Sequence, residues 1–341
     1  MTELIIDADA AGKRLDKYLS GRFRGLGIGR INKELRQRGI TVNRKKTPAD
    51  YRLQQGDVIR LYCGVPSQQQ SDPALTQYAE ARARFGSRIS VLYEDADVMI
   101  IDKPAGILSQ KAAPEDLSIN EWFIGLMLER GEVTAESLVS FRPSVCNRLD
   151  RNTSGCLICG RTLSGSRRMG ACIREHRLQK YYLALVHGNV TAPATLCDAL
   201  LKDEKKNAVR LVDEGKERDH QSGRMAEAYL GYRPISRCAD DQITLLEVQL
   251  FTGRTHQIRA QLAAAGFPIL FDPKYGDRAA DRRLLRRHGA MADAPNRQLL
   301  HCSRLVFPED AQLKDLSGRE IRCDCPGDMK QWYQNVKGEN Q

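Results

Sequence analysis

The sequence predicts an α+β protein in two parts, a small N-terminal α/β module and a larger domain of mixed strands and helices. Segments with helical spacing and short alternating apolar segments follow one another along the chain of 341 residues. A Gln/Ser-rich stretch at residues 67–72 has the composition of a linker. A chain of this length, 41% hydrophobic, can bury the cores of one large domain and one small one.

The first module is predicted to contain two helices and two strands. Leu15, Tyr18 and Leu19 recur at the spacing of one helical face. After them we expect a glycine-rich turn, a second helix that stops at Gly39, and two alternating strands, at residues 25–29, 30–38, 40–43 and 56–61. We therefore place the first module at residues 1–66.

Positive charge is dense within this module. One interpretation is a solvated basic face, which many helices carry, but the density favours contact with RNA. The order of elements resembles a small α/β RNA-binding module that is also found in a small-subunit ribosomal protein. The candidate RNA-binding residues are Arg30, Lys33, Arg36, Arg44, Lys45 and Lys46.

The rest of the chain is predicted to be a linker at 67–88, a domain at 89–327 and a C-terminal tail at 328–341. Residues 75–85, before the domain, have weak helical character. A charged segment at 201–223 is interpreted as long hairpin connections on the surface. Expected strands are 91–95, 98–103, 156–159, 179–188, 229–232, 244–250, 299–302 and 305–307, and expected helices are 121–130, 164–175 and 260–265.

Composition limits the partners. The net charge of +10 and the pI of about 9.1 favour an anionic partner. Nucleic acid fits better than a membrane, because no apolar run approaches the length of a spanning helix. The start of the chain lacks a secretory signal, and its 10 cysteines are expected to be reduced thiols in the cytoplasm.

Two cysteine pairs raise the question of zinc. Cys156 and Cys159 lie inside an apolar strand, where their side chains would face opposite sides. Cys323 and Cys325 form the second pair, and neither pair has a His at finger spacing. We interpret these thiols as small buried hydrophobes and predict no metal site.

Asp150 is the centre of the most informative stretch. It lies between Arg148 and Arg151, ahead of a polar turn at 153–155 and the apolar strand at 156–159. A carboxylate at the mouth of a rigid sheet is where catalytic groups tend to lie. The alternative is an ordinary surface ion pair.

Residues 147–150 (Asn-Arg-Leu-Asp) and 153–155 (Thr-Ser-Gly) resemble the signature of the RluA-type RNA pseudouridine synthases, which include enzymes acting on large-subunit ribosomal RNA. Residues 252–259 (Thr-Gly-Arg-Thr-His-Gln-Ile-Arg) resemble a second signature of this family, in the expected order. The resemblance extends from about residue 90 to about 327. It implies a mixed, largely antiparallel sheet.

The resemblance also implies the roles of individual residues. Asp150 matches the catalytic aspartate, Arg259 the arginine beside it, and Tyr182 the tyrosine of the family's Lys-x-Tyr element, although Tyr181 is adjacent. Arg148 matches an arginine that fills the space left by the displaced base or holds the displaced strand.

Other positions near the two signatures are less telling. The family's usual histidines are replaced by Asn147 and Gln261, which keep hydrogen-bonding capacity. Arg254 and His256 are interpreted as residues that shape the start of the helix.

The reaction explains why a carboxylate is needed. Pseudouridine formation breaks the glycosidic bond and rejoins the base through carbon. Asp150 would either attack the anomeric carbon or remove the 2′ proton, and the sequence leaves both routes open. It must be ionised in a pocket that excludes water, which the guanidinium of Arg259 would favour. No redox step occurs, so neither a cofactor nor a metal is expected.

We therefore predict an enzyme that isomerises uridines to pseudouridine in RNA, with large-subunit ribosomal RNA as the default substrate and transfer RNA left open. One alternative is a non-catalytic RNA-binding protein that keeps the fold. Another is a nuclease, although no cluster of acidic metal ligands occurs. A cytoplasmic monomer with no protein partner and no membrane association is expected.

Overall fold

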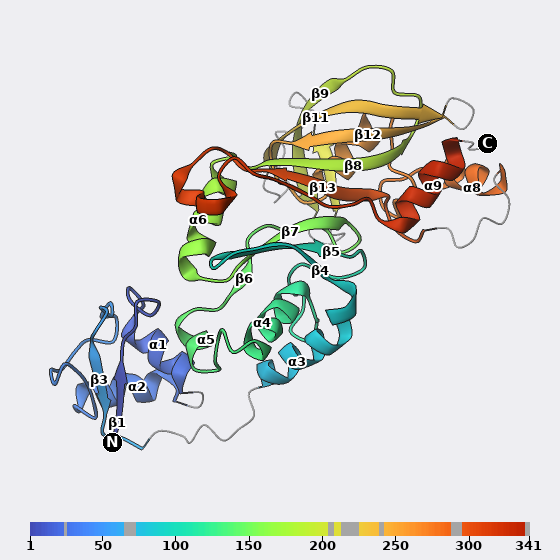
Figure 1. Cartoon of the computed structure of the whole chain (residues 1–341). Coiled ribbons are helices and arrows are strands. Elements are labelled where there is room, and N and C mark those ends of the chain that lie inside the picture. The colour runs from blue at the N-terminus through green and yellow to red at the C-terminus, as the bar shows by residue number, and fades with distance from the viewer. Residues whose placement is uncertain are drawn as a thin grey trace.

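The computed structural model describes residues 1–23, 26–64, 73–203, 208–212, 225–238, 242–287 and 295–337 (Figure 1). Gly25 and the predicted linker stretch at 67–72 lie outside these residues, as do 204–207 and 213–224 of the charged segment. Among the groups of buried apolar residues, one lies within residues 6–61 and a larger one is built on a large sheet.

The N-terminal module is a three-stranded sheet covered by two helices. The strand order is β1-β3-β2, with both pairs antiparallel. Leu15 and Leu19 on one helix and Ile31 and Leu35 on the other are buried in its core, as their helical spacing predicts. The elements are β1 (Thr2–Ile5), α1 (Leu15–Arg22), α2 (Ile28–Arg36), β2 (Ile40–Val42) and β3 (Val58–Leu61).

The second helix of this module ends earlier than predicted. We expected it to continue to Arg38 and stop at Gly39, but α2 ends at Arg36. Arg38 takes the left-handed conformation, with φ 60°. A Cβ at Gly39 would lie 2.1 Å from a carboxylate oxygen of Glu34, the end of a flexible side chain that can move aside, so this contact does not require glycine.

The second domain is built on an eleven-stranded sheet with the order β10-β9-β11-β12-β8-β13-β7-β5-β4, to which β14 and β6 add at β13 and β7. Every pair is antiparallel except β13 with β7, so the prediction of a mixed, largely antiparallel sheet is confirmed. The strands are β4 (Ser90–Glu94), β5 (Val98–Lys103), β6 (Ser144–Val145), β7 (Ser154–Gly160), β8 (Gln179–His187), β9 (Ala194–Asp203), β10 (Ala208–Val212), β11 (Met225–Cys238), β12 (Ile243–Leu250), β13 (Leu300–Val306) and β14 (Glu320–Arg322).

Helices flank this sheet, with α3 and α4 beneath β5 and β7 in Figure 1. The helical segments are α3 (Pro73–Phe85), η1 (Gly86–Arg88), α4 (Ile119–Glu129), α5 (Ser137–Ser140), α6 (Leu163–Arg174), α7 (Gln257–Ala264), α8 (Arg278–Arg287), η2 (Ala311–Leu316) and α9 (Gly327–Lys337). None of the helices in the described ranges is both long and apolar enough to cross a membrane.

Two segments that we predicted to be peripheral are packed. Residues 73–88 of the predicted linker form α3 and η1, and Ala81 and Phe85 are buried in the core of the second domain. Residues 328–337 of the predicted tail lie in α9, where the ring of Trp332 packs on Phe271 with centroids 4.8 Å apart. Both segments therefore belong to the second domain, because their apolar faces are covered by it.

The charged segment at 201–223 also differs from the prediction. Residues 201–203 end β9 and residues 208–212 form β10, which pairs with β9 in antiparallel register. Val209 and Leu200 are buried between these strands and α7. The part that we can describe is therefore sheet rather than connection.

The N-terminal module contacts the second domain through α5. Val139 packs against the core of the module, and the ammonium of Lys13 donates to the carbonyl of Val139 at 2.7 Å and to that of Ser140. These carbonyls lie at the end of α5, where a cation is favourable. Figure 1 shows α1 and α5 side by side, so this contact fixes the module against the larger domain.

Candidate active site

The loop that carries Asp150 is held at two points, by the loop that follows β5 and by β7 of the sheet. The hydroxyl of Ser109 donates to the carbonyl of Leu149 at 2.8 Å and accepts from its amide at 3.0 Å. The side-chain oxygen of Asn147 accepts from the amide of Ile158 in β7 at 2.8 Å. Asn147, which stands where the family usually has His, thus serves as a backbone anchor, and Asp150 has little freedom to move.

A buried lysine supports the same loop from below. Lys103, at the end of β5, is fully buried, and its ammonium donates to the carbonyls of Pro104 (3.0 Å), Arg151 (3.1 Å) and Thr153 (2.8 Å). These three bonds use all three of its protons. Burial lowers the pKa of Lys103 to about 7, against the attraction of the Asp150 carboxylate. Sequence reasoning placed this strand and turn but missed the role of its lysine.

Gly155 allows the two parallel strands to meet beside the loop. Its φ is 114°, and a Cβ there would lie 2.1 Å from the carbonyl oxygen of Cys302 in β13. Only glycine fits this conformation and this approach. The hydroxyl of Ser154 and the imidazole of His301 share a hydrogen bond of 2.9 Å across the same pair of strands.

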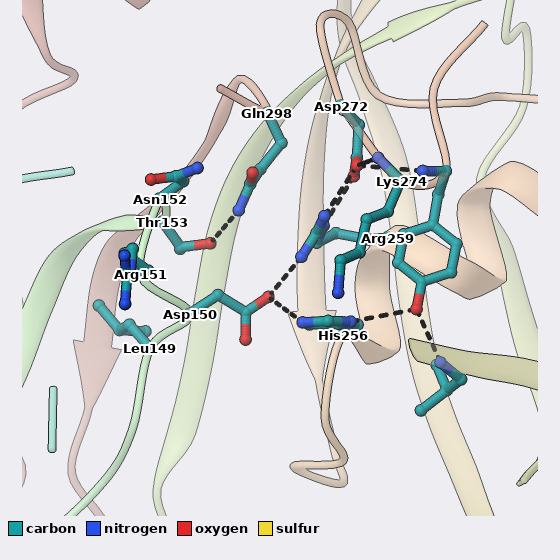
Figure 2. Close-up of polar contacts among 12 residues, drawn as sticks. Leu149, Asp150, Arg151, Asn152, Thr153, His256, Arg259, Asp272, Lys274 and Gln298 are labelled. Atoms are coloured by element: carbon teal, nitrogen blue, oxygen red, sulfur yellow. Dashed lines mark hydrogen bonds and ion pairs between the residues drawn. The ribbon is translucent and has the colours of Figure 1, made fainter. Parts of the chain in front are cut away.

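Arg259 joins Asp150 to a second carboxylate. Its Nη1 donates to Asp150 Oδ2 at 3.1 Å, while Nε and Nη2 donate to both oxygens of Asp272 at 2.7 and 2.8 Å (Figure 2). Burial opposes the charge of each member, but these bonds outweigh it, raising the pKa of Arg259 and lowering that of Asp272. Arg259 is therefore a fixed guanidinium aimed at Asp150.

His256 lies closer to the reaction centre than we predicted. It has a left-handed backbone, with φ 50°, immediately before α7, which begins at Gln257 rather than Ala260. Its Nε2 lies 3.9 Å from Asp150 Oδ2, and its Nδ1 shares a hydrogen bond of 3.1 Å with the hydroxyl of Tyr275. Burial lowers the pKa of His256, which keeps the ring neutral near pH 7. Our interpretation as helix-start architecture alone was incomplete.

Tyr182 faces the pocket that opens over Asp150. The pocket has a volume of about 270 Å³ and is lined by both residues together with Arg259 and His256. Burial raises the pKa of Tyr182, so it remains a neutral phenol. Tyr181 points to the other face of β8, where Arg304 lies over its ring at 3.8 Å. Of the two tyrosines, Tyr182 is the one placed beside Asp150.

Comparison with known proteins agrees with this geometry. The family described as RNA pseudouridylate synthase matches residues 97–264. The ribosomal large subunit pseudouridine synthase C of Escherichia coli (strain K12) is 31% identical over 335 residues, covering 97% of this chain and 95% of that protein. Its namesake from Vibrio cholerae is 30% identical over 322 residues, covering 91% and 90%.

The chain belongs to the RNA pseudouridine synthases. It is thus an isomerase that converts uridine to pseudouridine within RNA. A solved structure, human RNA pseudouridylate synthase domain containing 4, shares the fold, with a TM-score of 0.57 at 20% identity over 77% of this chain and 97% of that one.

Two exposed arginines of the synthase stand at the pocket. Arg148 lines it and makes no hydrogen bond or ion pair with any residue that the structure describes. Arg254 donates to the carbonyl of Glu227 at 3.0 Å. Gln261, the second departure from the family pattern, is buried instead and donates to Asp198 (2.6 Å) and to the carbonyl of Ala228 (3.1 Å). It therefore joins α7 to the sheet and does not line the pocket.

The six candidate RNA-binding residues of the module are all exposed, on α2 and in the turn after β2. A further basic surface was not predicted: α8 carries five exposed arginines, and its Asp281 anchors it to His187 in β8. The signal was present in the sequence Arg-Arg-Leu-Leu-Arg-Arg, with Leu284 facing the core. Those five are Arg278, Arg282, Arg283, Arg286 and Arg287.

The described residues contain no group of three or more His, Cys, Asp or Glu side chains arranged to hold a metal ion. Cys156 and Cys159 are buried in β7, and all ten cysteines are free thiols. Burial raises the pKa of Cys159, so it stays protonated.

Proposed function

We propose that this synthase modifies uridines of large-subunit ribosomal RNA, with Asp150 as the catalytic carboxylate. The observation that carries the assignment of Asp150 is its contact with Arg259 at 3.1 Å in a pocket that Tyr182 also lines. Relatives in Escherichia coli and Vibrio cholerae that match at least 90% of this chain are named for the large ribosomal subunit, which supports the choice of RNA.

In this proposal Asp150 acts at the sugar while the base is detached, by attacking C1′ or by removing the 2′ proton. Arg259 holds the carboxylate aimed at the sugar, because Asp272 fixes the guanidinium through two hydrogen bonds. Tyr182 offers its ring to the base. His256 adds a neutral ring near Oδ2, the carboxylate oxygen that Arg259 also contacts.

The target uridine must leave its stack to reach this pocket, which costs a few kcal/mol. Arg148 is exposed beside Asp150, and its guanidinium has no partner among the residues that the structure describes, so we assign it to the space that the uridine leaves or to the displaced strand. The exposed cations of the module would contact phosphates, which supplies affinity with little sequence information. These contacts are assigned to Arg30, Lys33, Arg36, Arg44, Lys45 and Lys46.

We also propose that the enzyme works as a monomer in the cytoplasm, without a protein partner or a cofactor. The ten free thiols fit a reducing compartment. The residues around Asp150 already supply the carboxylate, the cation and the aromatic ring that the reaction needs.

Mapping of pseudouridines tests the proposed substrate. Large-subunit ribosomal RNA and transfer RNA would be mapped from cells lacking the gene, and from the same cells carrying the parent or Asp150→Asn. Sites in large-subunit RNA should disappear, and only the parent should restore them. Loss confined to transfer RNA would overturn the choice of substrate, and restoration by Asp150→Asn would indicate a non-catalytic role.

Purified enzyme with EDTA should still convert uridine, whereas metal-dependent strand cleavage would identify a nuclease.

A further inference from the structure

Lys180 is a buried cation that lines the pocket, and the described part of the chain gives its ammonium no hydrogen-bond or ion-pair partner. It lies in β8 two residues before Tyr182, so both side chains are on the same face of the strand. Only 8% of its surface is exposed. Its ammonium makes no hydrogen bond or ion pair with any residue that the structure describes, and the position of a Cβ added to Gly253 is 3.8 Å away.

The contrast with Lys103 makes this unusual. Both lysines are buried, but the ammonium of Lys103 donates to three carbonyls. A buried charge is unfavourable unless it is paired, so the free enzyme bears a cost at Lys180 that a ligand could relieve. Burial also lowers the pKa of Lys180.

The position of Lys180 limits what that ligand can be. Asp150, held by Arg259 at 3.1 Å, is assigned to the sugar, and Lys180 makes no ion pair with the Asp150 carboxylate. Arg148 and Arg254 are exposed, where phosphates of the RNA backbone are accessible to them. The buried ammonium, next to Tyr182 among apolar side chains such as Leu250, is therefore suited to the base.

Building on the proposed function, we propose that Lys180 donates a hydrogen bond to a carbonyl oxygen of the uracil, O4 in the bound uridine. An ammonium has three donors and no acceptor. It can therefore pair with the O4 of uracil but not with the amino group that cytosine carries at the same position. A site built to bond one of these groups rejects a base that lacks it. Lys180 thus selects uridine over cytidine.

The same contact assists the reaction. Cleavage of the C1′–N1 bond leaves its electron pair on N1, and the negative charge spreads onto O2 and O4. After the base turns, a pair from the ring forms the C5–C1′ bond, C5 loses a proton and N1 gains one, so no co-reactant is needed. A fixed ammonium beside a carbonyl oxygen stabilises the detached base while it is an anion.

Binding measurements in an Asp150→Asn background, where no turnover is expected, test this inference. The probes are a ribosomal RNA fragment carrying a mapped target uridine and its twin with cytidine at that position. Lys180 should give at least about tenfold preference for uridine, equivalent to one good hydrogen bond. Lys180→Met should remove that preference, Lys180→Arg should keep part of it, and with Asp150 intact Lys180→Met should lower the single-turnover rate.

Arg254→Met is the matched control, since it removes an exposed cation of the same pocket and should weaken both RNAs equally. Thermal unfolding checks folding: Lys180→Met removes an unpaired buried charge and should not lower the Tm. An unchanged preference in Lys180→Met would overturn the proposal. So would equal weakening of both RNAs with a shallower salt dependence, because that result indicates a phosphate contact. The proposed function fails separately, if the parent forms no pseudouridine in the uridine fragment.

Discussion

The N-terminal module and the Asp150 pocket are both rich in cations but hold them in opposite ways. Arg30, Lys33 and Arg36 of the module are exposed and have no carboxylate partner among the described residues. Arg259 of the pocket is 5% exposed and bridges two carboxylates. Exposed charges cost little and are screened by salt, whereas buried charges must be paired and keep their geometry. We therefore expect the module to control affinity and the pocket to control rate.

The largest effect is expected at the pocket. Asp150→Asn should lower turnover by about 10⁴-fold or more, a size typical of losing a catalytic carboxylate, because an amide is neither nucleophile nor base. RNA affinity should hardly change, since the amide oxygen can still accept from Arg259. Single-turnover kinetics and equilibrium binding measure the two quantities. Turnover within about tenfold of the parent would remove Asp150 from the mechanism.

The next largest effect is expected for the ion pair between Arg259 and Asp272. Arg259→Met leaves Asp272 buried without its two bonds, so unfolding free energy should fall by about 3–5 kcal/mol and turnover with it. Arg259→Lys is the control, because it keeps the charge but not the two-pronged geometry. Denaturant unfolding gives the stability. An unchanged value in Arg259→Met would show that the buried pair contributes nothing.

The ion pair between Arg259 and Asp272 should also make the stability of the parent fall at acid pH. The folded pKa of Asp272 lies below its ordinary value of 3.8, held there by Arg259 against the effect of burial. Its contribution is therefore present above that pH and is lost as the pH falls toward the folded pKa. Denaturant unfolding between pH 5 and about 2 should show a loss in the parent that Asp272→Asn lacks.

Replacing Lys103 tests whether its hydrogen bonds to the Asp150 loop stabilise the protein. Lys103→Met should cost about 1–3 kcal/mol, since three carbonyls lose a donor. The pKa of Lys103 is about 7 in the folded protein and 10.5 in the unfolded chain. Between these two pH values the unfolded chain binds a proton that the folded protein has released, so the stability of the parent rises with pH. The variant should lack this gain. Lys330→Met, at an exposed lysine of α9, is the control and should change little.

For the module, the expected effect is on binding alone. Changing Arg30, Lys33 and Arg36 to Gln should raise KM and flatten the salt dependence by roughly 0.7–0.9 in log–log slope per lost phosphate contact. The saturated single-turnover rate should persist. This variant is cleaner than deleting residues 1–66, which would expose Val139 and remove the Lys13 contact. The same test on α8, with Arg282, Arg283 and Arg286 changed to Gln, is the control. An equal change there would mean that net charge sets the slope.

The smallest effect is expected for Asn147→His. The ring nitrogen of a histidine can accept the Ile158 amide that Asn147 now binds. Activity should stay within about tenfold of the parent. A much larger loss, with the protein still folded, would show that the loop depends on the smaller side chain.

The parts of the site that depend on particular residue types could be predicted from the sequence. Asp150 and Arg259 are 109 positions apart, yet two motifs sufficed to predict that they meet. The sheet and most of its strands followed from alternation and apolar runs. The six basic residues of the module that were predicted to bind RNA are all exposed.

What could not be predicted depends on tertiary contacts. The left-handed backbone of His256 turns its ring toward Asp150, and no local pattern indicates that conformation in a non-glycine residue. Lys103 precedes a recognisable turn and Lys180 precedes a recognisable pair of tyrosines. Only the fold shows that the ammonium of Lys103 donates three hydrogen bonds, whereas that of Lys180 has no partner among the described residues. The packing of α3 and α9 was missed because a short amphipathic segment does not identify its partner.

The parallel pairing of β7 with β13 has a consequence for folding during synthesis of the chain. Ser154 and His301, which bond across it, are 147 residues apart in the chain. At synthesis rates of about 5–20 residues per second, β13 is made roughly 7–30 seconds after the loop it supports. Until then the edge of β7 is uncovered and the Asp150 loop lacks one wall. During synthesis the chain therefore has no working pocket before β13 is made, and the exposed edge of β7 offers a place for premature association.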